Sequence, residues 1–308
     1  MTTSAAIEVS DLVINYRRKD QGPRAVDGLS FTVEAGECVG FIGANGAGKS
    51  STIKAIMGFI RPTEGKIEVF GESPGSTQSR QHVGYLPEVA LYYPFMKARE
   101  LLELYGGLHD LDRRELKKRI PQSLEEVGLK GQEETLLKNY SKGMQQRLGI
   151  AQALISSPKL LILDEMSSGL DPMGRADLRK LLLSLKAQGR TIFFSSHELT
   201  EVESLCDRVL MIHKGKRLYS AKASELAQPL NSYRVVFSLE DSQMPAELLS
   251  QCLRLSGNRR EFMTQDIAEY ASLLQTVSSA GGELHSIESK HHSLEDYFLE
   301  LVKKEGEA

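Results

Sequence analysis

The chain has 308 residues, with 38 lysines and arginines against 41 aspartates and glutamates, and a formal net charge of −3. This near-balance argues against a protein that binds nucleic acid or anionic lipid mainly through bulk positive charge. Hydrophobic residues make up 41% and charged residues 26%, as in ordinary globular proteins, so the chain can form one large domain or two smaller ones.

The first ninety residues predict five strands, over residues 7–16, 29–33, 37–42, 66–70 and 83–86. The first two alternate apolar and polar side chains, as half-buried strands do. The third is an apolar run that leads directly into a loop rich in glycine. A helix is predicted after that loop, because the stretch from Lys49 carries no breaker until Gly58.

A helical insertion is predicted over about residues 95–150. From about Lys97, apolar side chains recur at helical spacing, at Leu101, Leu104, Tyr105 and Leu108. The pair Gly106-Gly107 predicts that this helix ends near it, and the pattern then stays helical through Leu136.

The core resumes with a buried strand over residues 160–163. A helix follows, with Leu178, Leu181, Leu182 and Leu185 on one face and a stop at Gly189. A strand over 191–195 and a hairpin over 208–219, turning at 213–215, complete this part. Strands that alternate with helices predict an α/β domain with a largely parallel sheet.

The character of the sequence changes near residue 222, so we predict one domain over residues 1–222 and a second over 223–308. Residues 229–232 are the best candidate linker. The mixed pattern of the second domain, including 232–239 and 267–279, predicts a small α+β unit. Residues 293–301 predict an amphipathic helix, and His291 and His292 have no partner at ligand spacing.

The three cysteines, Cys38, Cys206 and Cys252, are far apart in the sequence and lack metal-ligand spacing. They favour a reducing compartment and a role as small buried side chains. Apolar runs are far shorter than the ~20 residues that span a bilayer, so no membrane span is expected. The first six residues show no pattern of a secretory signal.

Residues 43–50 match the phosphate-loop pattern G-x-x-x-x-G-K-[ST]. In this pattern, backbone N–H groups curl around phosphate oxygens at a helix N-terminus. Lys49 would reach the β- and γ-phosphates, and Ser50 would ligate Mg²⁺. The alternative is a glycine-rich turn with a surface lysine. The predicted nucleotide-binding residues here are Gly43, Asn45, Gly46, Ala47, Gly48, Lys49, Ser50 and Ser51.

Two acids, Asp164 and Glu165, follow the buried strand 160–163. The carboxyl end of such a strand is where open α/β sheets place ligands. Asp164 suits a Mg²⁺ site, and Glu165 could polarise a water towards the γ-phosphate. The alternative is an ordinary helix cap. A phosphate loop and an acidic pair still leave kinases, GTPases, motors and transport ATPases open.

Further motifs, at matching positions before and after the phosphate loop, resemble those of ABC ATPases. Residues 140–147, YSKGMQQR, resemble the LSGGQ signature, and residues 168–171, SGLD, resemble the D-loop. His197 stands where the family has its switch histidine, and Tyr16 where an aromatic residue stacks on adenine. Taken alone, the histidine could be structural and the tyrosine could be strand packing. The resemblance covers residues 7 to about 220.

The resemblance implies a P-loop NTPase of the ABC-ATPase fold that binds ATP with Mg²⁺. In the family, a signature serine and glycine, here Ser141 and Gly143, contact the γ-phosphate held by the opposite subunit. A second copy of the chain, or a homologous ATPase subunit, is therefore expected. Glu165 and His197 are the implied catalytic residues.

Three departures from the family pattern are present. Lys142 stands in the signature where glycine is usual, and Met166 replaces a common proline. Glu88 stands in place of the Q-loop glutamine, and its carboxylate can still ligate Mg²⁺. The expected metal ligands are therefore Ser50, Glu88 and Asp164.

The sequences of residues 85–88, of the signature and of residues 293–301 resemble those of the ATP-binding subunits of bacterial drug, antibiotic and polysaccharide exporters. This resemblance implies an integral membrane permease as partner and a peripheral position on the cytoplasmic face of the membrane. Tyr92, Phe95 and Met96 are candidate permease contacts, or they belong to local core packing.

An ABC protein acting on nucleic acid or ribosomes is disfavoured by the single cassette and the slight negative charge, so no nucleic-acid partner is expected. A regulatory module without catalysis is disfavoured by the full set of catalytic positions.

Overall fold

The computed structural model describes residues 5–16, 22–223, 232–264 and 266–290. The chain divides into two compact units, Met1–Ala223 and Ser224–Ala308, which are described separately. The helix predicted over 293–301, the two histidines before it and most of the predicted linker lie outside the described residues.

A six-stranded sheet forms the centre of the first unit. Its order is β5 (Val83–Leu86), β6 (Leu160–Leu163), β7 (Thr191–Ser196), β3 (Cys38–Ile42), β8 (Arg208–His213) and β9 (Lys216–Lys222). All neighbouring pairs are parallel except β8 and β9, which form the predicted hairpin. Strands β3, β6 and β7 are buried along their whole length, as expected for a parallel sheet covered on both faces. The predicted largely parallel α/β sheet is confirmed.

Four helices belong to this sheet. They are α1 (Lys49–Ile56), α2 (Thr77–Gln81), α6 (Pro172–Ala187) and α7 (Leu199–Leu205). Helix α6 begins with Asp171, whose side chain caps Gly174 N, and with Pro172 in its first turn. Helices α1, α6 and α7 follow β3, β6 and β7 of this sheet, so the loops before them lie at the carboxyl ends of those strands, whereas α2 precedes β5.

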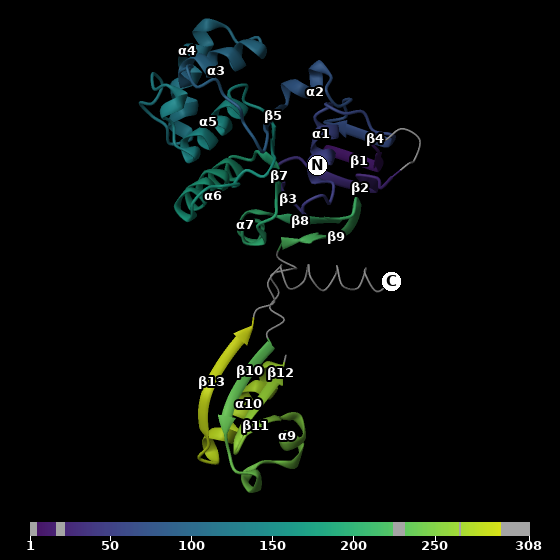
Figure 1. The fold of residues 1–308 in the computed structure, drawn as a ribbon, viewed down its shortest axis with the longest axis vertical. Coiled ribbons are helices and arrows are strands. Elements are labelled where there is room, and N and C mark those ends of the chain that lie inside the picture. Colours follow the sequence, from purple (N-terminus) through teal and green to yellow (C-terminus); the bar gives the residue numbers. More distant parts are fainter. Residues whose placement is uncertain (1–4, 17–21, 224–231, 265, 291–308) are drawn as a thin grey trace. The chain divides into compact units, whose positions relative to one another are not determined.

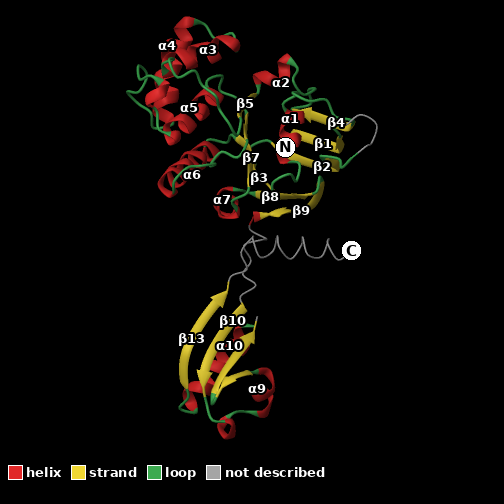
Figure 2. Cartoon of the chain, in the orientation of Figure 1, coloured by secondary structure: helices red, strands yellow, loops and turns green. Residues whose placement is uncertain are grey.

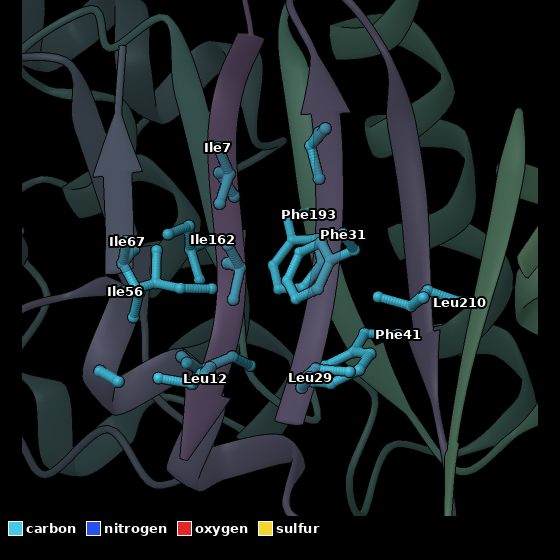
Figure 3. Packing of buried hydrophobic residues seen from close by; sticks show 14 of the residues in the cluster. Ile7, Leu12, Leu29, Phe31, Phe41, Ile56, Ile67, Ile162, Phe193 and Leu210 are labelled. Atoms are coloured by element: carbon cyan, nitrogen blue, oxygen red, sulfur yellow. The ribbon is translucent and has the colours of Figure 1, made fainter. Parts of the chain in front are cut away.

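A second sheet of the first unit is antiparallel, with the order β2 (Val26–Glu34), β1 (Ala5–Ile14) and β4 (Glu64–Val69). The strands were predicted, but not their separation from the parallel sheet. The two sheets share one core, in which Phe31 of β2 lies 6.0 Å from Phe41 and 5.7 Å from Phe193, between ring centroids. Figure 3 shows these rings together between the strands. Burial of each ring contributes on the order of 1.5–3 kcal/mol.

The helical insertion contains α3 (Ala98–Leu108), α4 (Arg113–Glu126), a 3₁₀ turn (Leu137–Asn139) and α5 (Lys142–Leu154). Figures 1 and 2 show these helices grouped on one side of the parallel sheet, away from the antiparallel one. The prediction that the pattern stays helical through Leu136 was wrong. Helix α4 ends at Glu126, because Gly128 and Gly131 adopt positive φ angles and turn the chain.

The predicted end of α3 near Gly106-Gly107 is confirmed, since the helix ends one residue later at Leu108, but Gly106 also has a packing role inside the helix. A Cβ on Gly106 would lie 2.1 Å from Leu116 Cδ2, so this glycine allows α4 to pack closely against α3. The predicted buried face was wrong in part, since Leu104 and Leu108 are exposed. Apolar spacing alone could not indicate which leucines contact a neighbouring helix.

The second unit is an antiparallel sheet with helices, as the predicted α+β character requires. The strand order is β11 (Leu253–Ser256), β12 (Arg259–Thr264), β10 (Ser232–Ser238) and β13 (Glu283–Lys290). Helices α9 (Ala246–Gln251) and α10 (Ile267–Ser279) and a 3₁₀ turn (Asp241–Gln243) complete it. Its own core contains Val235, Phe237, Leu239, Met244, Phe262, Leu273 and Val277.

All three cysteines are free thiols. Cys38 and Cys206 are buried, and burial raises the pKa of the Cys206 thiol well above its usual range. Cys252 is only partly buried, so the expected role as a small buried side chain fits it less well.

Among the described helices, none is both long and apolar enough to cross a bilayer.

Candidate nucleotide site

The phosphate loop, residues 43–50, connects β3 to α1 and can take its shape only with glycine at two points. Gly48 precedes α1 with φ +110°, and a Cβ there would lie 2.4 Å from Ala25 O. A Cβ on Gly43 would lie 2.4 Å from Ile212 O. The loop therefore lies close to neighbouring backbone and leads directly into a helix whose first N–H groups can bind an anion.

A cavity of about 460 Å³ lies over this loop. Its lining residues are Ala25, Ala44, Asn45, Gly46, Gly48, Lys49, Ser50, Ser51, Glu88, Glu165, Ser168 and His197. Most of the predicted nucleotide-binding residues, and both predicted catalytic residues, therefore meet at one cavity. Gly43 and Ala47 belong to the loop but do not line the cavity.

Lys49 is 6% exposed and has two partners. Its Nζ donates to Gly43 O at 2.7 Å and forms an ion pair with Glu165 Oε1 at 3.1 Å. The alternative interpretation of Lys49 as a surface lysine is wrong, because a charged ammonium can be buried only when such partners replace water.

The acidic pair after β6 is held by a serine of β7. Ser195 Oγ donates to Asp164 Oδ1 at 2.6 Å and accepts from Glu165 N at 2.9 Å. Glu165 has φ +47°, a conformation that is strained for a residue with a side chain and that is found at functional sites. Ser195 could not be predicted, because a serine at a strand end carries no distinctive signal in the sequence.

His197 follows β7 and contacts the same carboxylate. Its Nδ1 lies 2.6 Å from Glu165 Oε2, and its side chain is half exposed. Because an ionised carboxylate can only accept, Nδ1 carries the proton in this contact. Glu165 therefore lies between Lys49 and His197, with one carboxylate oxygen on each.

The residues present fit a Mg²⁺ ion. Ser50 Oγ lies 3.5 Å from Asp164 Oδ1, and Glu88 lines the same cavity. In the described part of the chain, no three His, Cys, Asp or Glu side chains form a closed metal cage. Mg²⁺ needs none, because it is usually held by one or two oxygen ligands of the protein together with phosphates and water. Burial, and then the charges of Asp164 and Glu88, raise the pKa of nearby Tyr85 to about 12, as expected in a negative field.

Tyr16 lies just beyond the end of β1 and is 63% exposed. Its hydroxyl donates to Ser51 Oγ at 3.1 Å. The ring therefore lies beside the start of α1 and is open to a ligand, and it does not pack inside the sheet as the alternative interpretation required.

The signature residues lie elsewhere in the first unit. Ser141 caps α5, its Oγ accepting from Met144 N at 3.2 Å, and is exposed together with Lys142. With Gly143, Gly169 and other residues they line a separate cavity of about 600 Å³. This cavity shares no lining residue with the cavity over the phosphate loop. One chain therefore does not bring Ser141 to its own phosphate loop.

The three candidate permease contacts differ in their surroundings. Tyr92 is partly buried, and its hydroxyl donates to Gln152 Oε1 at 3.1 Å, so it packs locally. Met96 is also partly buried, whereas Phe95 is 73% exposed. Next to them in the sequence, Leu91 is 88% exposed. A third cavity, of about 460 Å³, is lined by Phe59, Tyr85, Leu91, Tyr92, Tyr105, Leu108 and further residues.

The comparisons with known proteins point to one family. The family model for the ABC transporter matches residues 26–168. An uncharacterized ABC transporter ATP-binding protein of Nostoc sp. is 37% identical over 98% of this chain and 91% of its own length. The bacitracin transport ATP-binding protein BcrA of Bacillus licheniformis is 36% identical over 97% and 98%. The Nod factor export ATP-binding protein I of Rhizobium leguminosarum bv. viciae is 34% identical over 93% and 92%.

Comparison with solved structures points to the same family. An ATP-binding subunit of an ABC transporter is 32% identical, with a TM-score of 0.64, over 72% of this chain and 92% of that one. A dimeric ATP-binding cassette bound to ADP and Pi has the same TM-score at 21% identity, over 70% and 98%, which shows likeness of fold alone. The P-loop NTPase fold of the ABC-ATPase type is confirmed. The chain therefore belongs to the ABC transporter ATP-binding proteins and is an ATP-binding subunit of this family.

Proposed function

We propose that this chain hydrolyses ATP and uses the energy to drive a separate membrane permease in an exporter. The observation that carries the proposal is the position of Glu165. This buried carboxylate lines the cavity over the phosphate loop and contacts both Lys49 and His197. A carboxylate fixed beside a phosphate cradle can accept a proton from a water that attacks the γ-phosphate.

Each residue of the cavity has a distinct task in this proposal. Lys49 and the backbone N–H groups of residues 43–50 bind the β- and γ-phosphates, Glu165 orients the water, and His197 donates to the γ-phosphate. Tyr16 stacks on the adenine. Ser50, Asp164 and Glu88 would hold Mg²⁺, which when bound would neutralise charge on the phosphate oxygens.

A second subunit completes the site. Ser141, which is exposed, and Gly143, which is partly buried, line a cavity that shares no residue with the cavity over the phosphate loop, so they would contact a nucleotide held by another copy or by a homologous ATPase subunit. The N-terminus of α5 lies directly behind Ser141 and would favour an anion there. ATP thus draws two subunits together, and hydrolysis releases them.

The permease is proposed to bind beside the loop that follows Glu88. Val89, Leu91, Tyr93 and Phe95 expose 62–88% of their surface there, beside the third cavity. Monomeric proteins seldom expose contiguous apolar side chains of this size without a partner. The names of two relatives, for bacitracin transport and for Nod factor export, support an exporter. The subunit would then lie at the cytoplasmic face of the membrane, held by the permease.

Two measurements test this proposal. The purified chain should release phosphate from ATP with Mg²⁺ and stop when the metal is chelated. An integral membrane protein should co-purify with the chain from detergent-solubilised membranes of the native cell. A chain that binds ATP without hydrolysing it at any protein concentration would contradict the catalytic part. Recovery of RNA or ribosomal protein in place of a membrane protein would contradict the transport part.

A further inference from the structure

A buried carboxylate that the proposed reaction does not use joins the segment after β6 to the segment after β7. Glu201, on α7, is 6% exposed. Its Oε2 accepts hydrogen bonds from Ser167 Oγ at 2.9 Å and from Ser196 Oγ at 3.1 Å. Within the described residues Glu201 has no ion-pair partner, so these hydroxyls are what stabilise its charge.

The two serines lie beside the residues that would carry the reaction. Ser167 follows Glu165 by two positions, and Ser196 directly precedes His197. Both serines are almost completely buried. Through one carboxylate oxygen, Glu201 therefore connects the loop that carries the proposed water-orienting residue to the strand end that carries the proposed phosphate donor.

A second hydrogen bond, from Glu165 N to Ser195 Oγ, also joins the segment after β6 to β7. Ser195 Oγ accepts from Glu165 N and thereby fixes the backbone where β6 ends. Glu201 fixes the same loop two residues later, through Ser167. A residue with φ +47° keeps that conformation only when its surroundings hold it, so both supports are needed to keep the Glu165 carboxylate in place.

A third link between the same segments is more exposed. Arg175 of α6 forms an ion pair with Glu198 at 2.6 Å and donates to Leu170 O at 3.3 Å. One third of each of the two charged side chains is exposed, so water and salt weaken this pair. The buried link through Glu201 is therefore the stronger constraint on the loop.

We propose that Glu201 is a positioning residue for ATP hydrolysis, which acts through Ser167 and Ser196 on the relative placement of Glu165 and His197. The inference rests on the proposed function. Glu201 does not line the nucleotide cavity, so its loss should lower the rate of hydrolysis and leave nucleotide affinity nearly unchanged.

The test uses the full-length chain and two substitutions at one position. Glu201→Gln keeps the volume and one acceptor oxygen, whereas Glu201→Ala removes both acceptors. We expect kcat to fall about tenfold in Glu201→Gln and about 100-fold in Glu201→Ala, while KM and directly measured ATP affinity stay within about threefold. Ser167→Ala should lower kcat as well, and the double variant Glu201→Gln, Ser167→Ala should lose little more than the worse single one, because the two groups act as a unit.

Glu203→Gln is the matched control, since Glu203 lies on the same helix with an exposed side chain. It should keep the kcat of the unmodified chain. A kcat at the unmodified level in Glu201→Gln and Glu201→Ala would overturn the proposal. A parallel fall of kcat, ATP affinity and melting temperature would also overturn it, because it would show a purely structural role.

Hydrogen exchange separates failure of this inference from failure of the proposed function. If the unmodified chain hydrolyses no ATP, the proposed function fails, and the amides of residues 164–171 then decide whether Glu201 holds the loop. Faster exchange of these amides in Glu201→Gln, but not in Glu203→Gln, supports the positioning role. Unchanged exchange overturns it.

Discussion

Lys49 Nζ and Glu165 Oε1 lie 3.1 Å apart in a buried ion pair. The cation proposed to bind phosphate is thus neutralised by the carboxylate proposed to orient the attacking water. Both side chains are at most 11% exposed, so neither charge is well screened by solvent. Lys49 has three N–H donors and two partners here, so phosphate oxygens would compete with Glu165 for its positive charge, and we expect Glu165 to be freed for water as Lys49 turns to the phosphates.

Glu165→Gln should separate binding from turnover. The amide cannot accept a proton, so we expect turnover to fall by about 10²–10⁴-fold. ATP affinity should rise, because Lys49 loses a competing carboxylate and the phosphates lose a nearby negative charge. ATP-dependent dimers should accumulate, as measured by light scattering. The exposed Glu72→Gln is the control, and hydrolysis at the unmodified rate in Glu165→Gln would refute the role given to this residue.

Two inactive variants should restore activity when they are mixed. Lys49→Ala should lose ATP binding, and Ser141→Arg should block the signature surface. If each site uses the phosphate loop of one subunit and the signature of the other, a mixed dimer keeps one intact site. An equimolar mixture should then regain about a quarter of the unmodified phosphate release. No recovery, together with proof by native mass spectrometry that mixed dimers form, would contradict a shared site.

Leu91→Asp should release the permease. Leu91 is 88% exposed, so the substitution removes little packing within the subunit and places a charge on the proposed docking surface. We expect the membrane protein recovered in co-purification to fall at least tenfold, with an unchanged circular dichroism spectrum. Leu183→Asp, at an exposed position of α6, is the control and should leave recovery unchanged. Equal recovery with both variants would place the permease on another surface.

Two glycine-to-alanine substitutions should shift stability in opposite directions. A Cβ on Gly84 of β5 would lie 2.1 Å from the backbone Ala153 O of α5, so Gly84→Ala should cost about 1–3 kcal/mol. Gly107 lies in α3 with open space around it, so Gly107→Ala should add about 0.5–1 kcal/mol. Thermal denaturation followed by circular dichroism measures both. Equal melting temperatures would show that the packing of β5 against α5 is looser than the structure has it.

Most residues of the nucleotide cavity could be predicted, because they belong to short motifs or stand at positions that the family resemblance marks. The phosphate loop needs its glycines between a strand and a helix, and the acids follow a run of buried residues. Such signals are contained within about ten residues. The parallel sheet followed from the same alternation of apolar strands and amphipathic helices.

Contacts between distant segments could not be predicted. The pairing of Lys49 with Glu165, and the link from Glu201 to Ser167, join side chains more than thirty residues apart. Nothing in their local sequence distinguishes these residues from surface charges or helix caps. The close packing of Leu116 against Gly106 could not be predicted for a similar reason, since a glycine near the end of a helix and one that admits a neighbouring leucine look alike in the sequence.

Occupation of the Lys49 ammonium by an internal carboxylate has a consequence for selectivity. Chloride, sulfate or a single orthophosphate offers few contacts. Each would have to compete for Lys49 with Glu165, which belongs to the same chain and is already in contact with the ammonium. A ligand with several linked anionic groups can outcompete Glu165, because it contacts the loop amides, the lysine and the serines at once. We therefore expect the contact between Lys49 and Glu165 to disfavour small anions relative to a polyphosphate.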